Sequence, residues 1–198
     1  MDRTMNGARR FAQWGLWFGG ALVLLAAVLI GIDVLMRKFL DRSIGGADEL
    51  AGYSLAIGTA WGLGAALLDR AHIRIDSLYV LFPQKLRLAL DVAALMLLVG
   101  FFALVAWHGL GVVSQSWTSG SRSQSALETP TVIPQALWIV GLLGFVVVGV
   151  LLFLHAAGMI ARGDLAGAAR AIGTRSAEEE VEDEIRDLKD RQAREGNT

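Results

Sequence analysis

The chain has 198 residues, a formal net charge of −1 and no cysteine. Its hydrophobic fraction of 54% and mean hydropathy of +0.50 are too apolar for a soluble domain of this size, since charged residues make up only 19% and are unevenly distributed. The absence of cysteine excludes disulfides, thiolate catalysis and cysteine-bound metal or iron–sulfur centres.

Four windows of the sequence are almost free of charge and long enough to cross a bilayer. They are residues 14–36, 50–68, 88–113 and 134–161, of 19 to 28 residues each, and Asp33 and Asp91 are their only Asp, Glu, Lys or Arg residues. Even the shortest window covers about 28 Å as a helix, close to the thickness of the hydrocarbon core. Because the windows are continuously apolar, they do not fit the alternating strands of a membrane barrel. We predict an all-α membrane protein with four transmembrane helices, at about 14–36, 50–68, 86–113 and 134–161.

Basic residues near the ends of the spans predict the orientation. Ten Lys and Arg would flank the spans on one side of the membrane and four on the other. Since the cytoplasmic side carries the excess, both termini are predicted to be cytoplasmic. The 23-residue first window exceeds the apolar core of a signal peptide, about 7–15 residues, so we expect it to be retained. Residues 1–13 then form a cytoplasmic N-terminus, 14–161 the transmembrane domain and 162–198 a charged cytoplasmic tail.

Two segments outside the spans are predicted to form further helices. The stretch Asp69–Pro83 is too polar to cross the membrane, but its apolar and aromatic side chains suit the headgroup boundary near Asp76–Phe82. This pattern predicts a short interfacial amphipathic helix. In the tail, Ser176 and Glu179 form a capping box that would begin a charged helix. That helix is either a solvated single helix or a docking helix for a partner.

Small residues recur every four positions along two opposite faces of the second span. One face carries Gly52, Ala56, Ala60 and Gly64, and the other carries Ser54, Gly58, Gly62 and Ala66. Such residues let helix backbones approach closely in lipid, where van der Waals contact drives association. We therefore predict that the second helix is central and packs on two sides.

Ionisable residues inside the spans are candidate functional groups. Asp33 and Asp91 each have an arginine four residues away, Arg37 and Arg87, and snorkelling or local pairing is the competing explanation for both. His108 and His155 are possible haem ligands in a four-helix bundle, but consecutive spans run antiparallel, so these two histidines would lie near opposite membrane faces. No phosphate loop, metal-ligand cluster or nucleophile–base arrangement occurs, so we predict that the chain is not an enzyme and holds no cofactor.

Several ordered motifs resemble a known family between about Trp14 and Arg162. Ala47–Tyr53 leads into the second span, Arg70–Asp76 follows it, and Ser125–Leu127 with Pro130 and Pro134 precedes the fourth span. Together with the four-span layout, these motifs resemble the small integral membrane subunit (DctQ type) of tripartite ATP-independent periplasmic (TRAP) transporters. The acidic tail is not part of that pattern.

The resemblance implies a scaffold within a secondary transport complex of the bacterial inner membrane. Its partners would be a large transmembrane transport subunit and a periplasmic substrate-binding protein, together with the lipid bilayer; no nucleic-acid partner is expected. Sodium ions would bind in the large subunit, which takes up an organic acid. Candidate residues for partner contact or packing are Asp48, Glu49, Tyr53, Gly58, Gly62, Arg70, His72, Arg74 and Asp76. Helix capping is the competing explanation for Asp48, as N-cap of the second span, and for Glu49 in its first turn.

Two other function classes remain open from the sequence. A self-sufficient small ion-coupled transporter would use Asp33 as a proton site in a homodimer, and proton-coupled flux from the purified protein alone would reveal it. A membrane redox subunit would bind haem through a histidine, and a Soret band would reveal it.

Overall fold

The fold was analysed in a computed structural model, which describes residues 2–70, 82–173, 185, 188–189 and 192. Its long helices are α1 (Asp2–Leu40), α2 (Ala47–Leu68), α4 (Gln84–Ser119) and α5 (Val132–Ala161), and α6 (Leu165–Ile172) is short. Each long helix is apolar enough to cross a membrane, which confirms the predicted all-α class with four spans. Apart from Phe82, the predicted interfacial helix lies outside the described residues, as does most of the predicted tail helix from Ser176.

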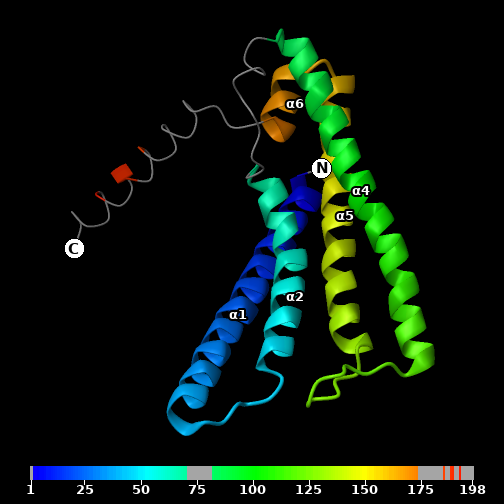
Figure 1. Cartoon of the computed structure of the whole chain (residues 1–198). Helices are drawn as coiled ribbons and strands as arrows, with labels where there is room; N and C mark the ends of the chain where they lie inside the picture. Colours follow the sequence, from blue (N-terminus) through cyan, green and yellow to red (C-terminus); the bar gives the residue numbers. More distant parts are fainter. Residues whose placement is uncertain (1, 71–81, 174–184, 186–187, 190–191, 193–198) are drawn as a thin grey trace.

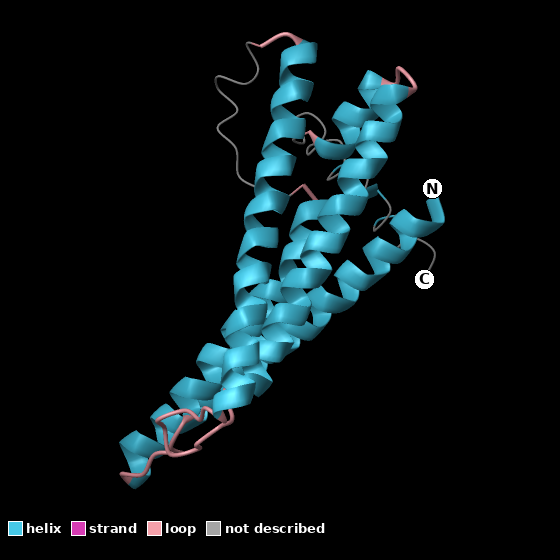
Figure 2. Cartoon of the chain, turned by 90° about the vertical axis from the view of Figure 1, so that its right-hand side faces the viewer, coloured by secondary structure: helices cyan, strands magenta, loops and turns pink. Residues whose placement is uncertain are grey.

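The four long helices form a bundle with two distinct ends (Figure 1). We call the end with residues 41–46 and 120–131 the loop end, and the end where α1 begins and α6 lies the α6 end. The apolar helices include Thr4–Leu40, of 37 residues, and Gln84–Ser119, of 36 residues. At 1.5 Å per residue both exceed about 50 Å, so they extend beyond a hydrocarbon core of about 30 Å. Figure 2 shows the elongated bundle from the side.

Glycines with positive φ angles end or begin several helices. Gly46 is the N-cap of α2 with φ of 85°, and Gly120 closes α4 with φ of 62°. After α5, Gly163 turns the chain with φ of 79°, and the Asp164 carboxylate then accepts a hydrogen bond from the Gly167 N–H at 2.8 Å. This left-handed backbone favours glycine. The Asp164 cap starts α6 directly after the last span.

The second helix, α2, lies between α1 and α5, so its predicted central position with packing on two sides is confirmed. Helix α5 is more central still, because it contacts each of the other four described helices. The larger core cluster contains residues of α2, α4, α5 and α6 and includes Phe145. The Phe102 ring of α4 packs edge-on against the Phe145 ring, with 4.8 Å between the ring centroids. A smaller cluster joins Ala60 of α2 to Ala106 of α4 and to α5.

Glycines of α5 receive the larger side chains of its neighbours. A Cβ at Gly141 would lie 2.6 Å from the Trp61 ring, and one at Gly149 would lie 2.5 Å from Val99. The Trp61 indole N–H donates a hydrogen bond to the Leu137 carbonyl at 2.9 Å, which joins α2 to α5. These close contacts explain how the most apolar span packs tightly against its neighbours.

Helix α6 folds back against the bundle within the region that the sequence indicates only as a charged tail. Ala168 and Ile172 on its inner face are buried and join the larger core cluster. Its last residues also cover Asp91, since a Cβ at Gly173 would lie 3.3 Å from an Asp91 carboxylate oxygen. The packed bundle therefore continues beyond the fourth span.

Candidate functional site

Asp33 ties the end of α1 to the loop that follows it. Its side chain is 2% exposed and pairs with Arg37 at 2.5 Å, as the spacing of four residues predicts. One Asp33 carboxylate oxygen also accepts hydrogen bonds from the Ser43 hydroxyl at 2.9 Å and from the Ile44 N–H at 2.7 Å. Three donors thus surround this carboxylate. The arrangement closes the 41–46 turn and gives Asp33 a structural role.

Asp48 and Glu49, the acidic pair at the start of α2, have different surroundings. The predicted N-cap role of Asp48 is wrong: Gly46 is the N-cap, and Asp48 lies in the first turn with a side chain 84% exposed, 3.7 Å from Arg37. The left-handed conformation that the turn requires favours glycine at that position. Glu49 accepts a hydrogen bond from the Ser125 hydroxyl, so it joins α2 to the loop between α4 and α5.

The two loops at the loop end contact each other. A Cβ at Gly46 would lie 2.5 Å from the Leu127 side chain, and one at Gly45 would lie 3.6 Å from Ala126. The second loop is braced internally, because the Ser123 N–H donates to the Thr129 carbonyl at 2.9 Å. The Ser125–Leu127 motif therefore packs on the turn before α2, together with the Glu49 contact.

Tyr53 lines a small cavity of about 220 Å³ near the loop end. Its walls come from α2 and from the start of α5, and they include Gln135 and Trp138. The Gln135 side-chain oxygen is buried without a hydrogen-bond partner among the described residues. The cavity is mostly apolar, with Tyr53 and Gln135 as its main polar groups.

The two predicted packing glycines of α2 differ in their surroundings. A Cβ at Gly58 would lie 2.9 Å from the Gly19 carbonyl oxygen and 2.9 Å from Val23, so α1 and α2 cross there in backbone contact. A Cβ at Gly62 would meet only the Leu16 side chain, at 3.9 Å, which is ordinary contact. Of these two glycines, Gly58 is the one at which the contact between α1 and α2 leaves no room for a side chain.

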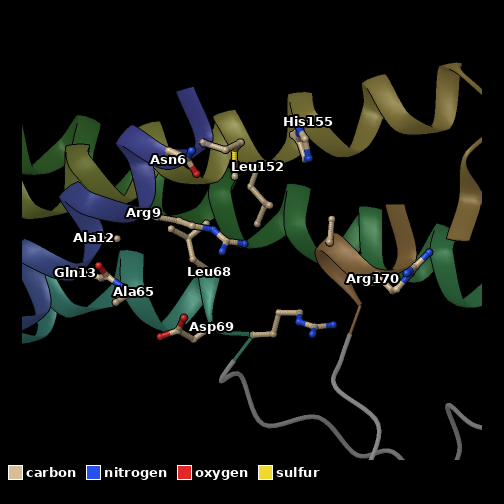
Figure 3. Close-up of a pocket in the computed structure, with 13 residues that line it drawn as sticks. Asn6, Arg9, Ala12, Gln13, Ala65, Leu68, Asp69, Leu152, His155 and Arg170 are labelled. Carbon is tan, nitrogen blue, oxygen red and sulfur yellow. The ribbon is translucent and has the colours of Figure 1, made fainter. Parts of the chain in front are cut away.

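At the α6 end, Arg70 lines a cavity of about 550 Å³ between α1, α2, α5 and α6 (Figure 3). Arg70 directly follows the C-cap of α2 and has a positive φ of 56°. The other predicted residues of its motif, His72, Arg74 and Asp76, lie outside the described residues. The structure therefore places Asp48, Glu49 and Tyr53 near the loop end and Arg70 at the α6 end, with Gly58 and Gly62 between them.

The family model of "Tripartite ATP-independent periplasmic transporters, DctQ component" matches residues 26–163. This chain belongs to the DctQ family. The match confirms the resemblance that the sequence motifs indicate, and it makes the chain a small membrane subunit of a TRAP transporter. No curated protein and no solved structure matches the chain.

The DctQ match covers most of the bundle but leaves both flanks outside. It includes the Asp33 turn, the Glu49–Ser125 contact and all of α5. It excludes the first 25 residues, with Gly19 and the N-terminal part of α1, and it ends before α6. The crossing at Gly58 and the cavity at the α6 end therefore combine DctQ-family residues with flanking residues.

The remaining ionisable residues of this DctQ subunit lie at different depths. His108 is 11 residues from the loop end of α4, and His155 is 23 residues from the start of α5. At 1.5 Å per residue these positions are about 17 Å and about 35 Å from the loop end, so the two imidazoles are about 18 Å apart along the bundle. No group of three His, Asp or Glu residues able to hold a metal occurs in the described part of the chain.

Sequence reasoning missed two features of the DctQ subunit, and only the first has a signal in the sequence. The first is α6: Asp164 is a good N-cap residue, and Leu165, Ala168 and Ile172 follow at helical spacing. The second is the large cavity, which no local motif indicates, because its lining residues come from four elements far apart in sequence.

Proposed function

We propose that the chain is the scaffolding subunit of its TRAP transporter and holds the large transmembrane subunit in place while that subunit carries the solute. In this proposal, a periplasmic binding protein delivers an organic acid and a sodium gradient drives uptake. The complex resides in the bacterial inner membrane, with both termini of this chain in the cytoplasm. Membership of the DctQ family supports the assignment to such a complex.

The observation that carries the scaffolding role is the state of the buried polar groups. Among the described residues, the polar or charged residues that are buried as a whole are Asp33, Asp91 and Ser116. Asp33 is enclosed by its own turn, and Asp91 is covered by the end of α6. These groups do not converge on one point, whereas a substrate or ion site within a bundle needs several polar groups at the same depth.

Broad apolar surfaces are available for a partner subunit or lipid. Only 11% of the most apolar window of α1 is buried within the chain, and 22% of the corresponding window of α4 is buried. Trp17 is 81% exposed and Trp107 is 73% exposed. Exposed aromatic and aliphatic faces of this extent suit a subunit that is enclosed by lipid and a larger membrane protein.

We expect reporter fusions to give opposite signals at two positions, because the basic residues are distributed 10 to 4 between the two sides. A fusion after Arg122 should report the periplasm, and a fusion after Arg175 should report the cytoplasm. The matched pair uses the same alkaline phosphatase and fluorescent protein reporters at both positions. A periplasmic signal at Arg175 would reverse the proposed orientation.

Reconstitution into liposomes tests the proposed function directly. The large subunit with the binding protein and this chain should give sodium-driven uptake, because the scaffold completes the complex. The same mixture without this chain should give little uptake, and this chain alone should give none. Ion-coupled flux from the purified chain alone would contradict the proposal and favour a self-sufficient transporter.

A further inference from the structure

The cavity at the α6 end has a chemistry that the scaffolding role does not use. It has a volume of about 550 Å³ and is lined by both apolar and basic side chains (Figure 3). Leu68, Leu152 and Met5 are among its apolar residues. Its charged lining residues are Arg9, Arg70, Arg170 and Asp69. The described lining residues thus carry three guanidinium groups and one carboxylate.

Arg9 contributes a positive charge to the lining of this cavity. Its side chain extends from α1 towards the space between Leu68 and Leu152 (Figure 3). Within the described part of the chain Arg9 forms no ion pair, either with Asp69 of the same lining or with another carboxylate. Arg170 contributes less to the interior, since its Nε donates to the Ala166 carbonyl at 3.4 Å.

His155 adds a polar group on the α5 side of the cavity, across from Arg9. Its Nδ1 atom is buried and has no hydrogen-bond partner among the described residues. A buried nitrogen of this kind costs stability unless a ligand or water satisfies it. A guanidinium on one side and an imidazole on the other can together bind the oxygens of an anion.

We propose that this cavity binds the phosphate of an anionic phospholipid headgroup, with Arg9 as the principal charged contact. The cavity lies where the apolar part of α1 begins, and Trp14 and Trp17 close to Arg9 are 76% and 81% exposed, as in an interfacial aromatic belt. Basic pockets between helices at this depth suit lipid headgroups. The apolar lining residues match the glycerol and upper acyl chain, which a free phosphate ion lacks. The inference requires only that the chain spans a membrane, and it does not rest on the proposed scaffolding role.

Native mass spectrometry of the full chain with phosphatidylglycerol tests the assignment. Arg9→Gln should weaken phosphatidylglycerol binding about fivefold, the effect of one basic residue near an anionic lipid surface. Arg10→Gln is the matched control, because Arg10 is the neighbouring residue with the same charge, is exposed as Arg9 is, and does not line the cavity. It should leave binding within about twofold of wild type, which corresponds to about 0.4 kcal/mol. His155→Leu gives a second, independent variant and should also weaken binding.

Three results would overturn the proposal. Equal binding by wild type, Arg9→Gln and His155→Leu would show that the cavity does not hold the lipid. Equal weakening by Arg9→Gln and Arg10→Gln would indicate general attraction to a basic helix end. Displacement of phosphatidylglycerol by millimolar inorganic phosphate would identify a site for soluble anions in place of a lipid site.

Discussion

Gly58→Leu is expected to weaken the contact between α1 and α2 and to reduce recovery of the complex with the large subunit. A side chain at this position would meet the Gly19 carbonyl oxygen and Val23, each 2.9 Å from the added Cβ. The carbonyl belongs to a helix backbone and cannot move aside alone, so the two helices must separate. Such overpacking typically costs about 1–3 kcal/mol in the free energy of unfolding. Thermal unfolding in detergent and co-purification with the large subunit measure the two effects.

The matched control is Gly52→Leu in the same helix. A Cβ at Gly52 would meet no atom within 4 Å, so the same change in volume should leave the stability of the isolated chain close to wild type. Gly62→Leu should have an intermediate effect, because its nearest neighbour is the flexible end of Leu16 at 3.9 Å. Equal loss of stability from Gly52→Leu and Gly58→Leu would show that the close crossing is not the cause.

Asp33→Ala is expected to release the loop that joins α1 to α2. The substitution leaves the Ser43 hydroxyl, the Ile44 N–H and the Arg37 guanidinium without their shared acceptor. A buried polar group left without its partner lowers the free energy of unfolding by more than the hydrogen bond itself contributes. The Tm of the chain should therefore fall clearly. Limited proteolysis should also show faster cleavage within residues 41–46.

Asp48→Ala is the control for this prediction, since it removes an equal charge from the same end of the bundle. The Asp48 side chain is 84% exposed and lies 3.7 Å from Arg37, so its ion pair is weak. Its loss should change neither the Tm nor the cleavage rate appreciably. Similar effects from Asp33→Ala and Asp48→Ala would point to general electrostatics at the loop end and against the specific role of Asp33.

The features that the sequence predicted are those that depend on residues near one another along the chain. The four spans follow from the length and hydropathy of each window, and the Asp33–Arg37 pair follows from a spacing of one helical turn. The DctQ resemblance likewise rests on short motifs at the ends of spans, and the family match confirms it. In each case the information is local.

Features that depend on packing between distant segments were not predictable in the same way. The sequence pattern predicts the same packing role for Gly58 and Gly62. Of the two, only Gly58 lies at the crossing, because the position of α1 decides which glycine contacts its backbone. The N-cap of α2 was misassigned to Asp48, since the preceding loop needs a left-handed residue that Gly46 supplies. Glu49 contacts Ser125, 76 residues away, and no pattern within either motif indicates that contact.

The central claim is that this chain holds the complex together and contains no substrate or ion coupling site. The most direct measurement is uptake by reconstituted complex, normalised to assembled protein, over a range of substrate and sodium concentrations. The variants replace the ionisable residues within the spans: Asp33→Asn, Asp91→Asn, His108→Ala and His155→Ala. Apparent affinities should stay within about twofold of wild type, equivalent to about 0.4 kcal/mol. A tenfold change in either affinity from any of these variants, with assembly intact, would place a coupling site in this chain and contradict the account.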